Sequence, residues 1–271
     1  MIALFVTMAA GAIAGALGQL LGIGGGVFLV PVMNVGLGLP MRAASAVSLV
    51  TVIATSSITS AAPGRLHRVN LRLGMVLEIF TTLGGFFGIL FVNRFSTRTL
   101  EAAFGVLLGA IAIVMASRLD RRNVIRGDAG DTGVLGGRYY DADTGAEVSY
   151  RLRRPPVAFA ASFTAGFAST LGIGGGVLKV PALNAWCGVP MRVAAATSAL
   201  MIGATAVVGS INYFVRGDIV PHLAAAATLG VLAGSRAGEL IGARSRVRTH
   251  KQLMAIVLGA VALVYAVRVW R

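Results

Sequence analysis

Three features of the sequence predict an all-α polytopic membrane protein whose two halves form an inverted repeat. The chain of 271 residues is 56% hydrophobic and only 13% charged, with a mean hydropathy of +0.81. Its apolar stretches come in two sets, and the second set repeats the first. Basic residues gather in the segments that we expect on one side of the membrane. A soluble domain of this length would need a far more polar surface, so membrane spans of about 20 residues explain the composition.

Each half of the chain contains five apolar stretches. In the first half they lie at about 2–21, 23–39, 43–62, 70–92 and 99–117. In the second half they lie at about 157–171, 173–189, 193–215, 219–241 and 252–267. We expect about eight transmembrane segments, or up to about ten if the short glycine-broken segments are counted separately. The corresponding domains are a first membrane repeat (1–118), an inter-repeat loop (119–155) and a second membrane repeat (156–271).

The duplication is visible when the chain is aligned with itself at an offset of 150 residues. Residues 21–42 then match residues 171–192 at 14 of 22 positions, and the offset continues without a gap for about 100 residues. A match of this length does not arise by chance. Internal repeats of this kind are common in secondary transporters.

The distribution of charge predicts how the halves are oriented. Residues 118–154 contain eight arginines, so we expect the 119–155 loop in the cytoplasm. Counting membrane crossings from this loop in both directions gives each half an odd number of crossings, so the halves lie antiparallel. Within the loop, "RYYDADTGAEVSYR" at 138–151 predicts two short strands of a β-hairpin around an Ala-Asp-Thr-Gly turn.

The composition also excludes several classes of function. A net charge of +14 indicates nucleic-acid binding only in a soluble protein, and here the cytoplasmic loops of a membrane protein explain it. The sequence offers no serine–histidine–aspartate set, no cluster of histidine or cysteine ligands and no paired carboxylates. We therefore expect no enzymatic activity, no metal site and no cofactor.

Two copies of one glycine motif predict the binding site. "LGIGGGVFLVP" lies at 21–31 and "LGIGGGVLKVP" at 171–181. Glycine permits unusual dihedral angles and proline lacks an amide donor, so each copy predicts a helix that breaks near the bilayer midplane and restarts. A restarted helix presents unpaired amides and the positive end of its dipole, which attract an anion. The expected contacts are Gly24, Gly25, Gly26, Gly174, Gly175 and Gly176. The alternative is that these glycines only allow close helix packing.

Lys179 distinguishes the second copy of the motif, because the first copy has Leu29 at this position. A cation deep in a membrane segment is costly unless it is paired or functional. We expect Lys179 to contact the anion; the alternative is that it snorkels or pairs with a distant acid. Few other ionisable groups lie at membrane depth, so Glu78 is the candidate proton carrier for coupling. It aligns with Thr228 in the second half and so has no acidic counterpart there.

Hydroxyl and amide side chains in neighbouring segments complete the candidate site. They are Ser48, Thr55, Ser198, Thr205, Asn34 and Asn184. The hydroxyls either line the path of the solute or bond back to carbonyl groups of their own helix and support packing. The two asparagines either bind the substrate or cap the end of a short helix.

At these residues the chain resembles the sulfite exporter TauE/SafE family of prokaryotic membrane proteins. The resemblance rests on the duplicated GxGGGxxxVP strings, on the Leu-Pro or Val-Pro that follows them, and on A-x-x-x-S at 44–48 and AATS at 195–198. It covers nearly all of residues 10–265 except the 119–155 loop. It implies a multi-pass permease in the plasma membrane of a prokaryote, in a family associated with the export of sulfite, sulfoacetate or related organosulfonates.

The motifs and the resemblance together lead us to expect a secondary transporter that exports a small sulfur-containing anion such as sulfite or an organosulfonate. Its expected partners are the small anionic substrate and the lipid bilayer, and we expect no nucleic-acid partner. Both a monomer and a homodimer are compatible with the sequence. Two alternatives remain at this point. One is a passive anion channel with the same site, and the other is a non-transporting membrane protein that docks a cytoplasmic protein through the 119–155 loop.

Overall fold

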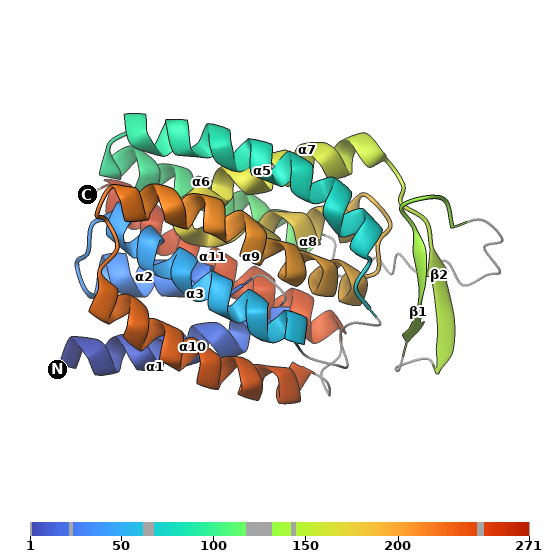
Figure 1. The fold of residues 1–271 in the computed structure, drawn as a ribbon, viewed down its shortest axis with the longest axis horizontal. Coiled ribbons are helices and arrows are strands. Elements are labelled where there is room, and N and C mark those ends of the chain that lie inside the picture. The colour runs from blue at the N-terminus through green and yellow to red at the C-terminus, as the bar shows by residue number, and fades with distance from the viewer. Residues whose placement is uncertain are drawn as a thin grey trace.

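The computed structural model describes residues 2–21, 24–61, 68–117, 132–141, 145–242 and 247–270, and these are mostly helical (Figure 1). The helices before the hairpin are α1 (Ile2–Leu21), α2 (Gly26–Pro31), the π-helix η1 (Val32–Gly36), α3 (Met41–Ala61), α5 (Leu71–Arg94) and α6 (Thr97–Ser117). Strands β1 (Gly137–Asp141) and β2 (Ala146–Tyr150) form the hairpin. The helices after it are α7 (Pro155–Ala168), the π-helix η2 (Ser169–Ile173), α8 (Gly176–Ala185), α9 (Met191–Val215), α10 (Pro221–Gly242) and α11 (Val247–Trp270).

Many of these helices have the length and composition of membrane spans. In the described residues, five are long and apolar enough to cross a bilayer, namely Met41–Ser60, Leu71–Arg94, Thr97–Val114, Pro155–Ile173 and Met191–Val215. Shorter apolar helices cover Ala3–Gln19, Gly26–Gly36 and Ala255–Arg268. Large apolar side chains such as Ile79 and Phe86 of α5 point outward, which suits a surface solvated by lipid. This is the helical, polytopic architecture that the sequence predicts.

The long helices pack in pairs that join distant parts of the chain. α1 packs along α10, α5 along α7, α3 along α9, and α6 along α11 (Figure 1). Glycines allow the closest of these contacts: a side chain at Gly84 of α5 would overlap the Phe163 carbonyl of α7, and one at Gly234 of α10 would overlap the Ala12 carbonyl of α1. Because these glycines have no Cβ, the backbones approach closely, as small residues allow in membrane helices.

The two short helices α2 and α8 begin inside this bundle, at the glycine motifs. Every residue of α8 except Leu178 is buried. The backbone bends at positive φ at Gly24 (72°), Gly172 (80°) and Gly174 (72°), a region that L side chains rarely adopt. The glycines therefore end one helical segment and let the next begin with a new direction. In this way they bring the first amides of α8 into the interior of the protein.

The hairpin lies at one end of the bundle, and the two chain termini lie at the other (Figure 1). Its strands are antiparallel, with Tyr139 opposite Val148. Three residues of the predicted turn, 142–144, are outside the described residues. Asn70 joins the hairpin to the bundle, since it accepts a hydrogen bond from the amide of Leu73 at the start of α5 and donates to the Tyr150 hydroxyl at 2.9 Å. Burial raises the pKa of the Tyr150 phenol, and its hydrogen bond with Asn70 acts in the opposite direction.

Candidate functional site

The two glycine motifs meet in the interior of the protein. A side chain at Gly26 would overlap the carbonyl oxygen of Gly172 and lie 2.6 Å from Ser48 Oγ. A side chain at Gly172 would lie 2.7 Å from the Cα of Ser45. The bend before α8 is therefore packed directly against the start of α2 and against α3. Only residues without a Cβ fit at Gly26 and Gly172.

Hydroxyl groups satisfy the backbone carbonyls that this bend leaves without a helical partner. Ser45 Oγ donates to Leu171 O at 2.8 Å, and Ser48 Oγ donates to Gly172 O at 2.7 Å. From the other side, the Tyr213 hydroxyl donates to Thr170 O at 2.7 Å. Ser48 was predicted as a site residue, whereas Ser45 and Tyr213 were not. Ser45 lies three residues before Ser48 and hence on the same face of α3, which is the signal that would have revealed it.

The starts of α2 and α8 receive no help from side chains. Gly25 and Gly175 occupy the capping positions, and neither helix has a side-chain cap. Serine, threonine, aspartate or asparagine would usually fill such a position and accept a hydrogen bond from an early amide. The positive end of the α8 dipole is therefore not neutralised by a side-chain cap.

A buried ion pair lies one turn into α8. Lys179 Nζ is 3.2 Å from Glu78 Oε2; the lysine side chain is completely buried, and the Glu78 side chain is 19% exposed. Thr205 Oγ1 donates to the second carboxylate oxygen of Glu78 at 2.6 Å. The three side chains come from α8, α5 and α9, so the pair joins segments that are 101 residues apart in the chain. Lys179 therefore pairs with an acid distant in the sequence, which is the alternative to direct contact with an anion in the sequence analysis. That acid is Glu78, the candidate proton carrier.

This polar cluster has no charged counterpart in the first copy of the motif. The position that matches Lys179 is Leu29, which is completely buried. The position that matches Glu78 is Thr228, whose hydroxyl is buried and forms no hydrogen bond. Thr55 matches Thr205, and its hydroxyl bonds back to the Thr51 carbonyl of its own helix at 2.8 Å. The Lys179–Glu78 ion pair therefore has no charged equivalent at the matching positions, Leu29 and Thr228.

The remaining predicted residues lie elsewhere in the network. Asn34 Nδ2 donates to Leu39 O at 2.8 Å, and Asn184 Nδ2 donates to Val189 O at 3.0 Å. Each asparagine thus bonds to the carbonyl five residues further along, which ties the end of its short helix to the following turn. Ser198 is completely buried, and its hydroxyl has no hydrogen-bond partner.

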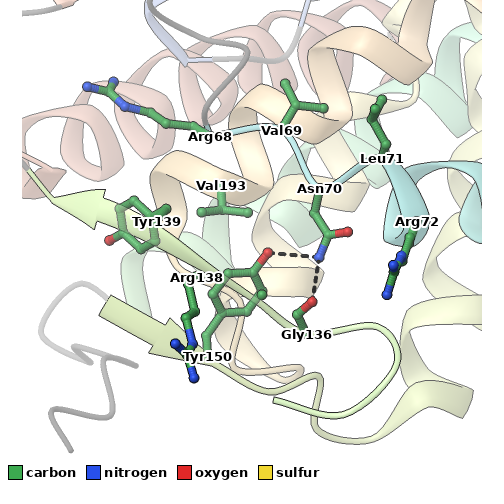
Figure 2. Close-up of a pocket in the computed structure, with 11 residues that line it drawn as sticks. Arg68, Val69, Asn70, Leu71, Arg72, Gly136, Arg138, Tyr139, Tyr150 and Val193 are labelled. Atoms are coloured by element: carbon green, nitrogen blue, oxygen red, sulfur yellow. Dashed lines mark hydrogen bonds between the residues drawn. The ribbon is translucent and has the colours of Figure 1, made fainter. Parts of the chain in front are cut away.

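A pocket of about 270 Å³ lies between the hairpin and the start of α5 (Figure 2). Figure 2 shows the Asn70 amide between the Tyr150 hydroxyl and the Gly136 carbonyl, at the centre of the lining residues. Arg68, Arg72 and Arg138 also line the pocket, but their guanidinium groups point in different directions and do not converge on one point. The pocket therefore carries positive charge without forming a single anion site.

Comparison with known proteins places this geometry in a family of transporters. The family model described as "Sulfite exporter TauE/SafE" matches residues 7–265. "Probable membrane transporter protein YunE" of Bacillus subtilis is 27% identical over 256 residues, which are 92% of this chain and 92% of that protein. "Probable membrane transporter protein MJ0441" of Methanocaldococcus jannaschii is 27% identical over 209 residues, which are 75% of this chain and 69% of that protein. No solved structure matches the chain.

The family match begins inside α1 and ends near the end of α11, so it includes both glycine motifs, the Lys179–Glu78 pair and all the paired long helices. It is thus a match to the whole membrane domain and not to one motif. The resemblance that the glycine motifs indicated is confirmed, and the chain belongs to the sulfite exporter TauE/SafE family of membrane transporters.

Proposed function

We propose that this protein is a secondary transporter that exports a small sulfur-containing anion, such as sulfite or an organosulfonate. Membership of the TauE/SafE family supports transport and suggests the class of substrate. The observation that carries the proposal is Lys179, a completely buried cation inside a membrane protein. Burying such a charge is costly, so evolution retains it where it binds a charged solute or forms part of a coupling mechanism.

The proposed binding site combines Lys179 with the backbone amides of Gly174, Gly175 and Gly176. Lys179 lies three residues after Gly176, which is about 4.5 Å along a helix axis. An ammonium group and the uncapped start of α8 therefore act on the same small volume. Glycines 24 to 26, packed against this bend, contribute shape more than charge. Thr205 of α9 is the neutral donor beside the Glu78 carboxylate.

We further propose that the two halves, 1–118 and 156–271, form an inverted repeat that works by alternating access, with the 119–155 loop in the cytoplasm of a prokaryote. The pairing of the helices supports this. Under the offset of 150 residues, the pair α1–α10 corresponds to α7–α5, while α3 and α6 pack against their own counterparts, α9 and α11. Such exchange of partners is what a twofold axis produces. The proposed eight membrane segments are α1, α3, α5, α6, α7, α9, α10 and α11, four from each half. Among them, α3, α5, α6, α7 with η2, and α9 have the length and hydropathy of membrane spans, which supports this assignment.

Anion flux into proteoliposomes tests this proposal. We expect the purified protein to move sulfite or sulfoacetate against a concentration gradient when an ion gradient is supplied. Lys179→Ala should abolish flux, whereas Leu29→Ala, at the matching buried position, should retain it. Flux that only follows the anion gradient would indicate a channel. No flux of any of these anions, together with capture of a cytoplasmic protein by the 119–155 loop, would contradict transport altogether.

A further inference from the structure

We propose that, in the empty transporter, the Glu78 carboxylate takes the place of the substrate anion beside the Lys179 ammonium. Glu78 must then bind a proton before the anion can replace it. This inference rests on the proposed function and adds its coupling mechanism. Its basis is geometric, because the same ammonium that would bind the anion is already 3.2 Å from a carboxylate. A carboxylate and a sulfur oxyanion present similar oxygen atoms to an ammonium, so the two compete for one position.

The charges of the possible states explain why the proton and the anion move together. In the empty site, the Glu78 carboxylate and the Lys179 ammonium sum to zero. In the loaded site, a neutral Glu78 acid, the ammonium and a monovalent anion also sum to zero. A site holding only the proton has charge +1, and a site holding only the anion has charge −1. An unbalanced charge is costly in a low-dielectric interior, so only the two neutral states change conformation readily.

The steps balance without any further reactant. A proton adds to the Glu78 carboxylate, and the ion pair with Lys179 separates. The anion binds the freed ammonium, the transporter changes conformation, and the anion leaves on the other side. The proton then dissociates from Glu78, the ion pair re-forms, and the neutral empty transporter returns to its first conformation. Thr205 can follow this change, because its hydroxyl donates to the carboxylate and accepts from the acid. One proton and one anion cross in the same direction per cycle.

The helices that pack against α5 and α8 offer no better placed proton carrier than Glu78. α7 and η2, which pack against α5, contain none, and Lys179 is the only one in α8. Those of α9 are Arg192 and Tyr213, which lie 13 and 8 residues from Thr205 and hence about 20 and 12 Å along the helix. In α6, which contacts α8, the titratable residues are Arg98, in its first turn, and Glu101, which forms an ion pair with Arg268 at 3.4 Å.

The neighbours within α5 are also distant from Glu78. Arg72 and Arg94 lie six and 16 residues away, which is about 9 and 24 Å along the axis. The Glu78 side chain is partly exposed, at 19%, whereas Lys179 is completely buried. A proton from water therefore reaches the carboxylate more easily than the ammonium. The net direction of transport depends on both gradients. The anion leaves the cell when its inside-to-outside concentration ratio exceeds the outside-to-inside ratio of the proton concentrations.

Sulfite flux and proton flux, measured together in proteoliposomes of the full chain, test the mechanism. For the wild-type protein we expect one proton per monovalent anion, counted after subtracting the protons that sulfite itself binds or releases between its singly and doubly charged forms. We also expect uptake driven by an acidic outside and no response to a potassium–valinomycin potential. Glu78→Gln imitates the protonated acid and leaves Lys179 available, so it should still exchange internal for external sulfite. Its empty state carries a net charge, so proton-driven net uptake should fall by about 100-fold or more. Glu101→Gln, which alters another acid in an ion pair, should keep both activities.

The possible failures are distinguishable. If the wild-type protein moves no anion, the proposed function is wrong. If it moves sulfite without a proton, or if Glu78→Gln keeps proton-driven net uptake, transport stands and the coupling role of Glu78 is wrong. A folded Glu78→Gln protein that loses exchange as well as net uptake also contradicts the proposal. The proton count on the wild-type protein requires no variant, so sulfite transport without a proton would overturn the mechanism even if Glu78→Gln does not fold.

Discussion

Gly26 and Gly172 are in direct backbone contact, although they belong to different copies of the motif. The Gly172 carbonyl oxygen occupies the space where a Gly26 side chain would be, and the same carbonyl accepts a hydrogen bond from Ser48. The triple glycines therefore have a packing role in addition to any role in binding. The glycine motif is compatible with close packing and with anion binding, and this contact shows that packing is present at Gly26.

The contact predicts that Gly172→Ala is strongly destabilising and Gly175→Ala is not. Gly172 has φ of 80°, and a Cβ there would lie 2.7 Å from the Cα of Ser45. The left-handed conformation alone costs a larger residue about 1–3 kcal/mol. A Cβ at Gly175 would have its nearest neighbour, Ala165 O, at 3.5 Å, which is an ordinary contact. Melting temperatures in detergent measure the difference, and equal shifts for the two variants would contradict this account.

Removing the hydroxyl of Ser48 should destabilise the bend. Ser48→Ala leaves the buried Gly172 carbonyl without this hydrogen bond, which costs about 1–3 kcal/mol. Ser57→Ala is the matched control in the same helix, because Ser57 is exposed and bonds only to the Ile53 carbonyl of its own helix. Denaturant or thermal unfolding should separate the two variants. If Ser57→Ala were equally damaging, loss of any α3 serine and not the bend would explain the effect.

Asn70 should control the docking of the hairpin. Asn70→Ala removes the cap of α5 and the amide that donates to the Gly136 carbonyl at 3.2 Å and to the Tyr150 hydroxyl. Loss of the cap alone costs about 1 kcal/mol. We expect faster hydrogen exchange in residues 137–150, with little change in the membrane helices. Asn93→Ala is the control, since Asn93 is exposed and makes one long hydrogen bond, at 3.4 Å, to Asn212. Unchanged exchange in Asn70→Ala would show that other contacts dock the hairpin.

The two partners of the ion pair should respond unequally to mutation. Glu78→Gln leaves a completely buried cation without its partner, whereas Lys179→Met leaves a carboxylate that is partly exposed. Breaking a buried pair costs about 3–5 kcal/mol when the remaining charge stays buried. We therefore expect Glu78→Gln to be the less stable variant and the double variant to recover part of the loss. A thermal double-mutant cycle measures this, and equal losses would contradict it.

Added anion should stabilise Glu78→Gln more than the wild-type protein. In this variant Lys179 is no longer occupied by a carboxylate, so sulfite can bind it without a proton. Ligand present at about 100 times its dissociation constant raises stability by about 2.7 kcal/mol. A thermal shift with sulfite, at constant ionic strength set by chloride, is the measurement. If Lys179→Met shows the same shift, sulfite is not binding at Lys179.

The sequence by itself determined the class of the protein and the places of most of its long helices, and it identified Lys179 as a candidate site residue. These depend on local properties: apolar runs of sufficient length, glycine and proline near the start of a helix, and one lysine where hydropathy predicts lipid depth. The same is true of the strands at 137–141 and 146–150, whose residue types favour a hairpin. The family resemblance, carried by duplicated strings, also needed no coordinates.

Only the tertiary structure decided which distant residues meet. Glu78 and Lys179 are 101 residues apart, and Ser48 and Gly172 are 124 apart, so no periodicity or spacing links them. The packing of α5 against α7 and α9, and of α3 against the bend before α8, brings each pair together. Helix packing depends on the shapes of whole surfaces, in which glycines such as Gly84 permit one approach and exclude others. For that reason the sequence could identify a charged lysine and a candidate proton carrier, but not that they are partners.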